Sequence, residues 1–202
     1  MAVVELPFQS TSSIAVVTRY KTTHTAMPKG GTGHTDCVLP NGAPVGFFST
    51  GLPISRGVVY GYALYASTRP HYIYAADART ASCISTILIL NVGKKRCEQF
   101  LKAWLSMRAK TTSYSLFSDN CASHASTALH AAGVLRRSEI PGLDTPGKLH
   151  DTIIKDGLVP WISQSGYLEF QPVQCGVDEM LLNFRVTLEP VTTPTKGGPV
   201  WV

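Results

Sequence analysis

The chain has 202 residues, of which 44% are hydrophobic and 15% are charged, and its mean hydropathy is +0.07. A chain of this size and composition can bury a core of its own, which excludes an intrinsically disordered protein and predicts a single domain over residues 1–202. The formal net charge of +5 is modest and the basic residues are scattered, so we do not expect nucleic acid as a partner.

The first third of the chain predicts strands and turns. Residues 14–20 alternate in polarity and predict a strand, and the glycine-rich residues 29–33 predict a loop. Residues 34–39 and 45–49 then predict the two strands of a β-hairpin around the Pro-Asn-Gly turn at 40–42. A histidine opens the first strand of this hairpin.

The middle of the chain predicts a central strand followed by a helix. Residues 58–65 and 71–75 are rich in Val and Tyr, and they fit either further strands or an insertion that faces the substrate. Residues 84–91 form a continuous apolar run, which is typical of a strand covered on both faces. Apolar residues at helical spacing predict an amphipathic helix over about 94–109.

A helix of small residues is predicted next. Residues 118–120 offer N-cap side chains, with Asp119 interpreted as a cap rather than an acid, and a glycine ends the apolar face at 133. A further helix is predicted over about 146–156. The remaining elements are strands over 167–173 and 180–188 and a loose tail over 192–202.

Five cysteines are spread along the chain without a CxxC pair. This spacing predicts neither a metal site nor a dense disulfide framework, we expect no cofactor, and the fold is typical of a reducing cytoplasm. We interpret Cys37, Cys83 and Cys97 as core residues, together with Trp104. We expect synthesis without a secretory signal peptide and no integral membrane segment, because the longest apolar run, 84–92, is far shorter than the ~20 residues of a membrane-spanning helix.

Cys121 is the candidate nucleophile. It lies in the first turn of the small-residue helix, where the partial positive charge of a helix N-terminus favours thiolate, and where unpaired backbone N–H groups can bind an oxyanion. A thiolate nucleophile also needs a nearby imidazole as base.

His34 is the candidate base, because it opens a strand directly after the glycine-rich loop. His124, one turn after Cys121, is the alternative. A polar residue is also expected to orient the imidazole, and Asp36, Ser49 and a partner not visible in the sequence are all open; Asp36 shares a strand face with His34.

These residues resemble those of circularly permuted NlpC-type papain-like cysteine hydrolases, in which a GHxGhhL-like strand brings the histidine before an Asn-Cys pair at a helix start. Asp36 departs from the pattern, because relatives often have glycine there. The resemblance covers roughly residues 33–156, and it rests on the segments 33–42, 46–48, 114–121 and 131–134.

The resemblance implies an α+β papain-like fold with a mainly antiparallel sheet packed against helices, a core at about 33–156, and C-terminal strands and a loose tail at 157–202. It implies a cysteine peptidase or amidase with catalytic Cys121 and His34, which cleaves an amide bond in bacterial peptidoglycan. Asp36 is added as our own candidate for the third catalytic residue, since the family motif does not supply it. Relatives include type VI secretion effectors, so secretion by a dedicated system into a target cell's periplasm, and a cognate immunity protein as partner, are expected.

Two other functions stay open at this point. The same residues could act on lipid esters or ubiquitin-like conjugates, as lecithin:retinol-acyltransferase-like and PPPDE-type relatives do. The chain could also be a non-catalytic binding domain on the same frame, in which case Cys121 would not react rapidly with a mild alkylating agent.

Overall fold

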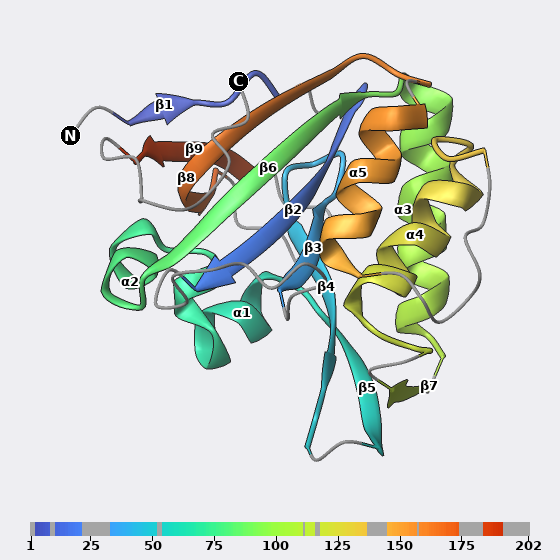
Figure 1. Ribbon diagram of the computed structural model, residues 1–202, viewed down its shortest axis with the longest axis horizontal. Coiled ribbons are helices and arrows are strands. Elements are labelled where there is room, and N and C mark those ends of the chain that lie inside the picture. The colour runs from blue at the N-terminus through green and yellow to red at the C-terminus, as the bar shows by residue number, and fades with distance from the viewer. Residues whose placement is uncertain are drawn as a thin grey trace.

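The computed structural model describes residues 3–8, 11–21, 33–51, 54–110, 112–115, 118–136, 145–156, 158–173 and 184–191. The described strands form one nine-stranded sheet in the order β1-β9-β8-β6-β2-β3-β4-β5-β7, and all neighbours are antiparallel (Figure 1). Five α-helices and a short 3-10 helix accompany this sheet within the described residues. The protein is therefore a mixed α and β protein with an antiparallel sheet, as expected.

The strands are β1 (Val4–Glu5), β2 (Ser13–Lys21), β3 (His34–Val38), β4 (Pro44–Ser49), β5 (Ile54–Tyr60), β6 (Cys83–Asn91), β7 (Thr112–Ser115), β8 (Trp161–Pro172) and β9 (Phe184–Pro190). The helices are α1 (Tyr62–Thr68), η1 (Pro70–Tyr72), α2 (Ala75–Thr80), α3 (Lys94–Arg108), α4 (Cys121–Ala131) and α5 (Pro146–Asp156).

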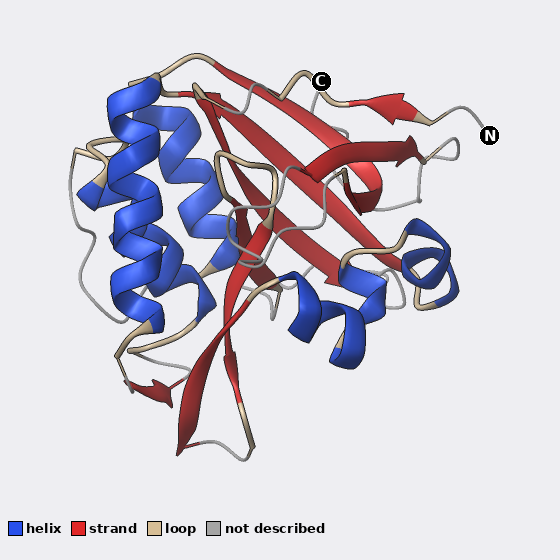
Figure 2. Ribbon diagram, turned by 180° about the vertical axis from the view of Figure 1, so that it is seen from behind, coloured by secondary structure: helices blue, strands red, loops and turns tan. Residues whose placement is uncertain are grey.

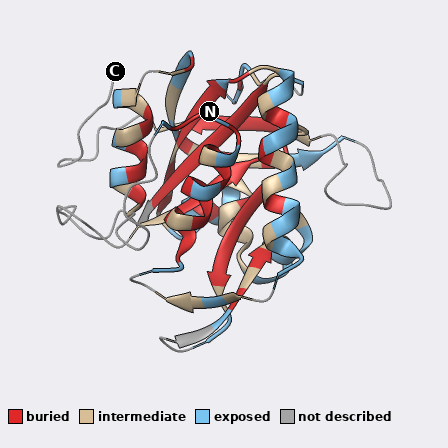
Figure 3. Cartoon of the chain, turned by 90° about the vertical axis from the view of Figure 1, so that its right-hand side faces the viewer, coloured by how far each residue is buried: buried red, intermediate tan, exposed pale blue. Residues whose placement is uncertain are grey.

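The helices form two groups on opposite faces of the sheet (Figures 1 and 2). One group is α3, α4 and α5, and the other is α1, η1 and α2. Because side chains alternate along a strand, each central strand contributes to both layers. Val16 and Leu88 belong to the core under α3, α4 and α5, whereas Val17 and Ile87 belong to the core beside α1 and η1. The central strands are buried between the two layers, and the outer faces of the helices meet solvent (Figure 3).

Several predicted elements are confirmed with small changes at their ends. The strand over 14–20 is β2, the hairpin strands are β3 and β4, and Gly42 adopts the positive φ of 86° that the turn requires. The apolar run at 84–91 is β6, which lies between β2 and β8 in the middle of the sheet. The predicted helices are α3, α4 and α5. The late strands are β8, which starts six residues earlier than expected, and β9.

The strand interpretation of 58–65 and 71–75 is wrong in most of its length. Strand β5 ends at Tyr60, and helix α1 begins at Tyr62. Residues 71–75 fall in η1, the turn that follows it and the start of α2. The aromatic residues that suggested strands pack instead as a helical layer over the sheet, with Tyr65 fully buried, so tertiary packing overrides their β-propensity.

The cysteines and the tryptophan that were predicted to be core residues are buried: Cys37, Cys83, Cys97 and Trp104. Strands β1 and β7, at the two edges of the sheet, have no counterpart among the predictions. The loop at 29–32, residues 180–183 of the last predicted strand, and the tail at 192–202 lie outside the described residues. Among the described helices, none is both long and apolar enough to cross a membrane.

Candidate active site

Helix α4 begins with a complete capping box. The Asn120 side-chain oxygen accepts hydrogen bonds from the backbone N–H groups of Ala122 and Ser123, both at 2.9 Å, and the Ser123 hydroxyl accepts from the Asn120 N–H at 2.9 Å. Asn120 is therefore the N-cap, and the interpretation of Asp119 as the cap is wrong. The capped helix start fixes Cys121 as the first helical residue, where the helix dipole favours a thiolate.

Strands β3 and β4 separate beside this helix start. Their pairing ends at Asp36 and Gly46, whereas β4 continues in register with β5 as far as Ser49. Thr35 therefore has no partner on β4 in the described pairing, and its backbone lies near the Cys121 thiol, whose pKa it lowers. The start of α4, on the opposite face of the sheet from the His34 side chain, thus lies near the place where the β3–β4 pairing has ended.

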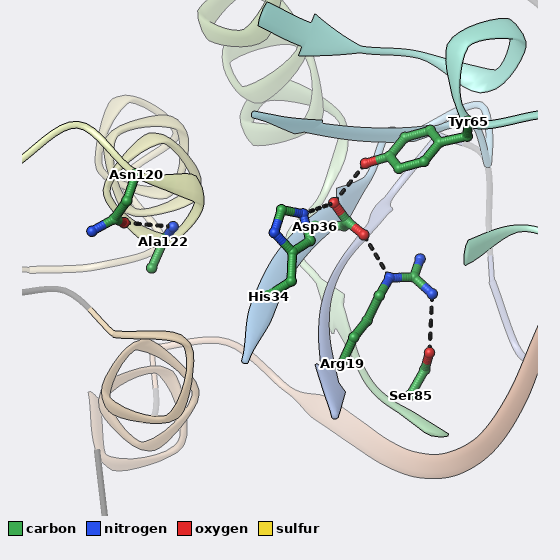
Figure 4. A network of polar contacts seen from close by, with 7 residues as sticks. All are labelled: Arg19, His34, Asp36, Tyr65, Ser85, Asn120 and Ala122. Atoms are coloured by element: carbon green, nitrogen blue, oxygen red, sulfur yellow. Dashed lines mark hydrogen bonds and ion pairs between the residues drawn. The ribbon is translucent and has the colours of Figure 1, made fainter. Parts of the chain in front are cut away.

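His34 points from β3 toward the Asp36 carboxylate, with the start of α4 on its other side (Figure 4). Its Nε2 lies 2.7 Å from Oδ1 of Asp36, and the side chain is 14% exposed. The imidazole also lies close to the Cys121 thiol, since each of the two groups shifts the pKa of the other. Because Nε2 faces Asp36, Nδ1 is the nitrogen left for the sulfur. The structure therefore brings Cys121, His34 and Asp36 together in one line of contacts.

Asp36 is completely buried and makes two more contacts. Its Oδ2 accepts from Nε of Arg19 at 2.5 Å, and its Oδ1 accepts from the Tyr65 hydroxyl at 2.5 Å. Arg19 is 2% exposed, donates from Nη1 to the Ser85 hydroxyl at 3.0 Å, and stacks over the Tyr72 ring at 4.4 Å. These contacts satisfy the carboxylate and hold it in one orientation, which a buried charge requires.

Four ionisable groups follow one another through the site, and their charged forms alternate in sign. They are the Arg19 guanidinium, the Asp36 carboxylate, the His34 imidazolium and the Cys121 thiolate. Burial alone would lower the pKa of His34, but Asp36 and Cys121 outweigh this effect and raise the pKa to about 9. Burial raises the pKa of Asp36, but His34 and Arg19 together bring it down to about 2. Burial likewise raises the pKa of Cys121, and the neighbouring His34 and the Thr35 N–H outweigh it, so that the pKa lies below that of an ordinary thiol. The arrangement favours the thiolate–imidazolium form of the Cys121 and His34 pair over its neutral form.

Aromatic rings fix the position of the imidazole and of a phenol beside the thiol. Phe48 stacks on His34 with ring centroids 4.1 Å apart. Its neighbour Phe47 points to the other face, where it stacks on His124 at 3.5 Å and on Tyr114 at 5.5 Å. The Tyr114 hydroxyl lies beside Cys121, and both the thiol and the backbone of Cys121 act on the pKa of the phenol. Burial and the nearby Cys121 raise the pKa of Tyr114 to about 12, so the phenol keeps its proton and can donate.

His124 and Ser49, the alternatives for the base and for the orienting residue, make other contacts. The ring of His124 is stacked on Phe47, and its Nδ1 faces the Asn120 carbonyl oxygen at 3.2 Å. Burial lowers the pKa of His124. The Ser49 hydroxyl donates to the Gly51 carbonyl at 2.7 Å. Asp36, rather than Ser49, is the partner that the structure gives to His34.

Four contributors to the site were not predicted from the sequence: Arg19, Tyr65, Tyr114 and the backbone N–H of Thr35. Only Arg19 left a signal, because it is a cation at the position that continues the buried face of Ala15 and Val17. Such a cation on a central strand indicates a buried ion pair. Thr35 and Tyr65 depend on contacts between segments far apart in the chain, whereas Tyr114 comes only seven residues before Cys121.

Comparisons with known proteins identify no relative. No family model matches the chain, no curated protein matches it, and no solved structure matches it. Within the described part of the chain, no group of three or more His, Cys, Asp or Glu side chains could hold a metal ion. The function must therefore be argued from the geometry of the site itself.

Proposed function

We propose that this protein is a cysteine hydrolase of the papain-like type, with Cys121 as nucleophile, His34 as acid and base, and Asp36 as the residue that orients His34. The observation that carries the proposal is the His34 side chain, which contacts the thiol with one nitrogen and the buried Asp36 carboxylate with the other. This is the geometry by which a nucleophile, a base and an orienting group act together.

The order of the residues supports a permuted papain-like frame. The nucleophile opens a helix that packs on an antiparallel sheet, and the base opens a neighbouring strand. His34 precedes Cys121 in the chain, as in the circularly permuted NlpC-type enzymes that the sequence resembles. The Asp36 that departs from the motif of those enzymes is the carboxylate that contacts His34.

The proposed reaction is acyl transfer to water. The Cys121 thiolate attacks an amide carbonyl and forms a tetrahedral intermediate, and the His34 imidazolium gives its proton to the departing amine as the acyl-enzyme forms. Neutral His34 then takes a proton from water as the water attacks the thioester. The thiolate leaves, and the proton stays on His34, which restores the starting ion pair.

The oxyanion would be stabilised by groups that already surround the thiol. The backbone N–H of Cys121 lies at the helix start, and the Tyr114 hydroxyl lies beside both this N–H and the sulfur. Fixed donors at the place where negative charge develops are worth roughly 10²–10³ in kcat each.

The substrate that we propose is an amide bond in bacterial peptidoglycan, with the protein acting as an antibacterial effector and with an immunity protein that covers Cys121. The resemblance supports this assignment, and the net charge of +5 is compatible with an anionic cell wall. The proposed place of action is the periplasm of a target cell.

The test is digestion of purified peptidoglycan by the wild-type protein, Cys121→Ala and His34→Ala, with mass analysis of the released fragments. Fragments from the wild type alone are expected, and their masses identify the bond. If none of the three proteins releases fragments, the cell-wall assignment is wrong, and esters of lipids and ubiquitin-like conjugates become the substrates to assay.

A further inference from the structure

Arg69 lies beside the candidate active site and takes no part in the proposed chemistry. It follows α1, and its backbone is held on both sides: its N–H donates to the Tyr65 carbonyl at 2.8 Å, and its carbonyl accepts from the Tyr72 N–H at 2.9 Å. The side chain is half-buried. Its guanidinium lies over the Phe48 ring, with Cζ 4.6 Å from the centroid, and 5.9 Å from the Tyr72 centroid.

Phe48 connects this guanidinium to the reacting groups. The same Phe48 ring stacks on the His34 imidazole at 4.1 Å, so Arg69 lies one ring away from the proposed base. The positive charge of Arg69 also reaches the phenol of Tyr114, the residue beside Cys121. Arg69 therefore lies near both the proposed base and the phenol that stands beside the proposed nucleophile.

The charge of Arg69 is not compensated by the rest of the site. Arg19 and Asp36 form one ion pair, and His34 and Cys121 form the next. No carboxylate of the described residues forms an ion pair with Arg69, in contrast to Arg79, which is paired with Glu189. A guanidinium that lies over a ring can still donate from its N–H groups, whose fork matches the two oxygens of a carboxylate.

We propose that Arg69 binds a carboxylate group of the substrate peptide, close to the scissile amide. The proposal rests on the function proposed for Cys121 and His34, and it narrows the substrate class to acidic peptides. The carboxylate can be the α-carboxylate at a peptide end or the carboxylate of an acidic side chain, since both present the same two oxygens.

The first experiment compares two alkylating agents that differ only in charge. Iodoacetate carries a carboxylate and iodoacetamide carries the neutral amide, and both react with the Cys121 thiolate. Rates at Cys121 are followed by peptide mapping in the wild type, in Arg69→Met and Arg69→Lys, and in Arg108→Met, a control at the exposed end of α3. We expect Arg69→Met to lower the iodoacetate-to-iodoacetamide ratio about tenfold, the size of a close charge interaction near a protein surface. Arg69→Lys should lower it less, and Arg108→Met should leave it unchanged.

The outcomes separate this proposal from the function on which it rests. Slow alkylation by both reagents in the folded wild type would overturn the proposed thiolate chemistry. Rapid alkylation with the same ratio in wild type and Arg69→Met would overturn only the role of Arg69. If Arg69→Met does not fold, the wild-type ratio at low and high salt decides, because a substrate-facing cation is screened and the ratio must fall as ionic strength rises.

A second experiment identifies the source of the carboxylate. Synthetic peptides containing the bond cleaved in peptidoglycan are made with either the terminal or the side-chain carboxylate converted to an amide. Wild-type kcat/KM should fall about tenfold for the peptide that lacks the bound carboxylate. Arg69→Met should not distinguish that peptide from its parent, and equal discrimination by both proteins would contradict the proposal.

Discussion

Gly46 lies directly opposite Asp36 where β3 and β4 pair, and the place of a side chain on Gly46 is occupied by the Asp36 carboxylate and the Tyr65 hydroxyl. The orientation of the carboxylate therefore depends on the absence of a single methyl group one strand away. Glycine is required here by space, since its backbone does not adopt a positive φ.

Gly46→Ala is expected to disturb the site. The new methyl group must push Asp36 away from His34, at a cost of about 1–3 kcal/mol in the free energy of unfolding, as for other overpacked cores. Peptidoglycan hydrolysis should fall by about 10² or more, because small displacements of catalytic groups are costly. Gly147→Ala in α5 is the matched control, since the added methyl group meets no atom there. Equal activity of the Gly46→Ala and wild-type proteins would show that Asp36 does not orient His34.

Removal of the Arg19 charge should be more destructive than removal of the ion pair as a whole. Arg19→Met leaves the Asp36 carboxylate buried without its cation, which costs roughly 3–5 kcal/mol in unfolding experiments with urea. The double variant Arg19→Met, Asp36→Asn removes both charges and should recover part of that stability. Its hydrolytic activity should stay low, because His34 has lost its carboxylate. If the double variant were less stable than both Arg19→Met and the wild type, the stability of the protein would not depend on the Arg19–Asp36 ion pair as described.

The reaction of Cys121 with iodoacetamide should depend on pH through its ion pair with His34. The pKa of Cys121 is lowered, so the thiolate persists to a lower pH than in an ordinary thiol and is lost as the pH falls through that lowered value. The pKa of His34 is raised to about 9, so the imidazolium that must protonate the leaving amine is lost as the pH rises through about 9. Hydrolysis should therefore be bell-shaped, with its alkaline limb near pH 9.

His34→Ala provides the control for this pH dependence. Without the imidazolium, burial dominates and the pKa of Cys121 should move above that of an ordinary thiol. Alkylation at pH 6–7 should become slow, and the difference from the wild type should narrow in strongly alkaline solution. An unchanged pH profile in His34→Ala would contradict the ion pair.

Tyr114→Phe should separate oxyanion binding from thiolate formation. The variant keeps the ring that packs on Phe47 but loses the hydroxyl beside Cys121. We expect kcat to fall by roughly 10–10³, with a smaller change in the iodoacetamide rate, because alkylation forms no oxyanion. Tyr167→Phe, on β8, serves as the control. If both rates fell together, the role of Tyr114 would lie in the ionisation of the thiol.

The sequence by itself determined the elements with strong local patterns. The apolar run of β6, the helical spacing of α3, the Pro-Asn-Gly turn and the cap-rich start of α4 are properties of neighbouring residues, so the chain reveals them without its fold. His34 and Cys121 were selected on the same local basis, from their places at a strand start and a helix start. Asp36 was one of several open candidates for the orienting residue, because it shares a strand face with His34.

The tertiary structure alone decided which residues surround His34, Asp36 and Cys121, and which protonation states this environment favours. Thr35 contacts the thiol because β3 and β4 separate, Tyr114 reaches it from an edge strand, and Tyr65 reaches Asp36 from a helix where the sequence suggested a strand. Arg19 becomes the counter-ion of Asp36 only when both are buried side by side. Long-range contacts and burial set these relationships, and neither is encoded in the spacing of residues along the chain.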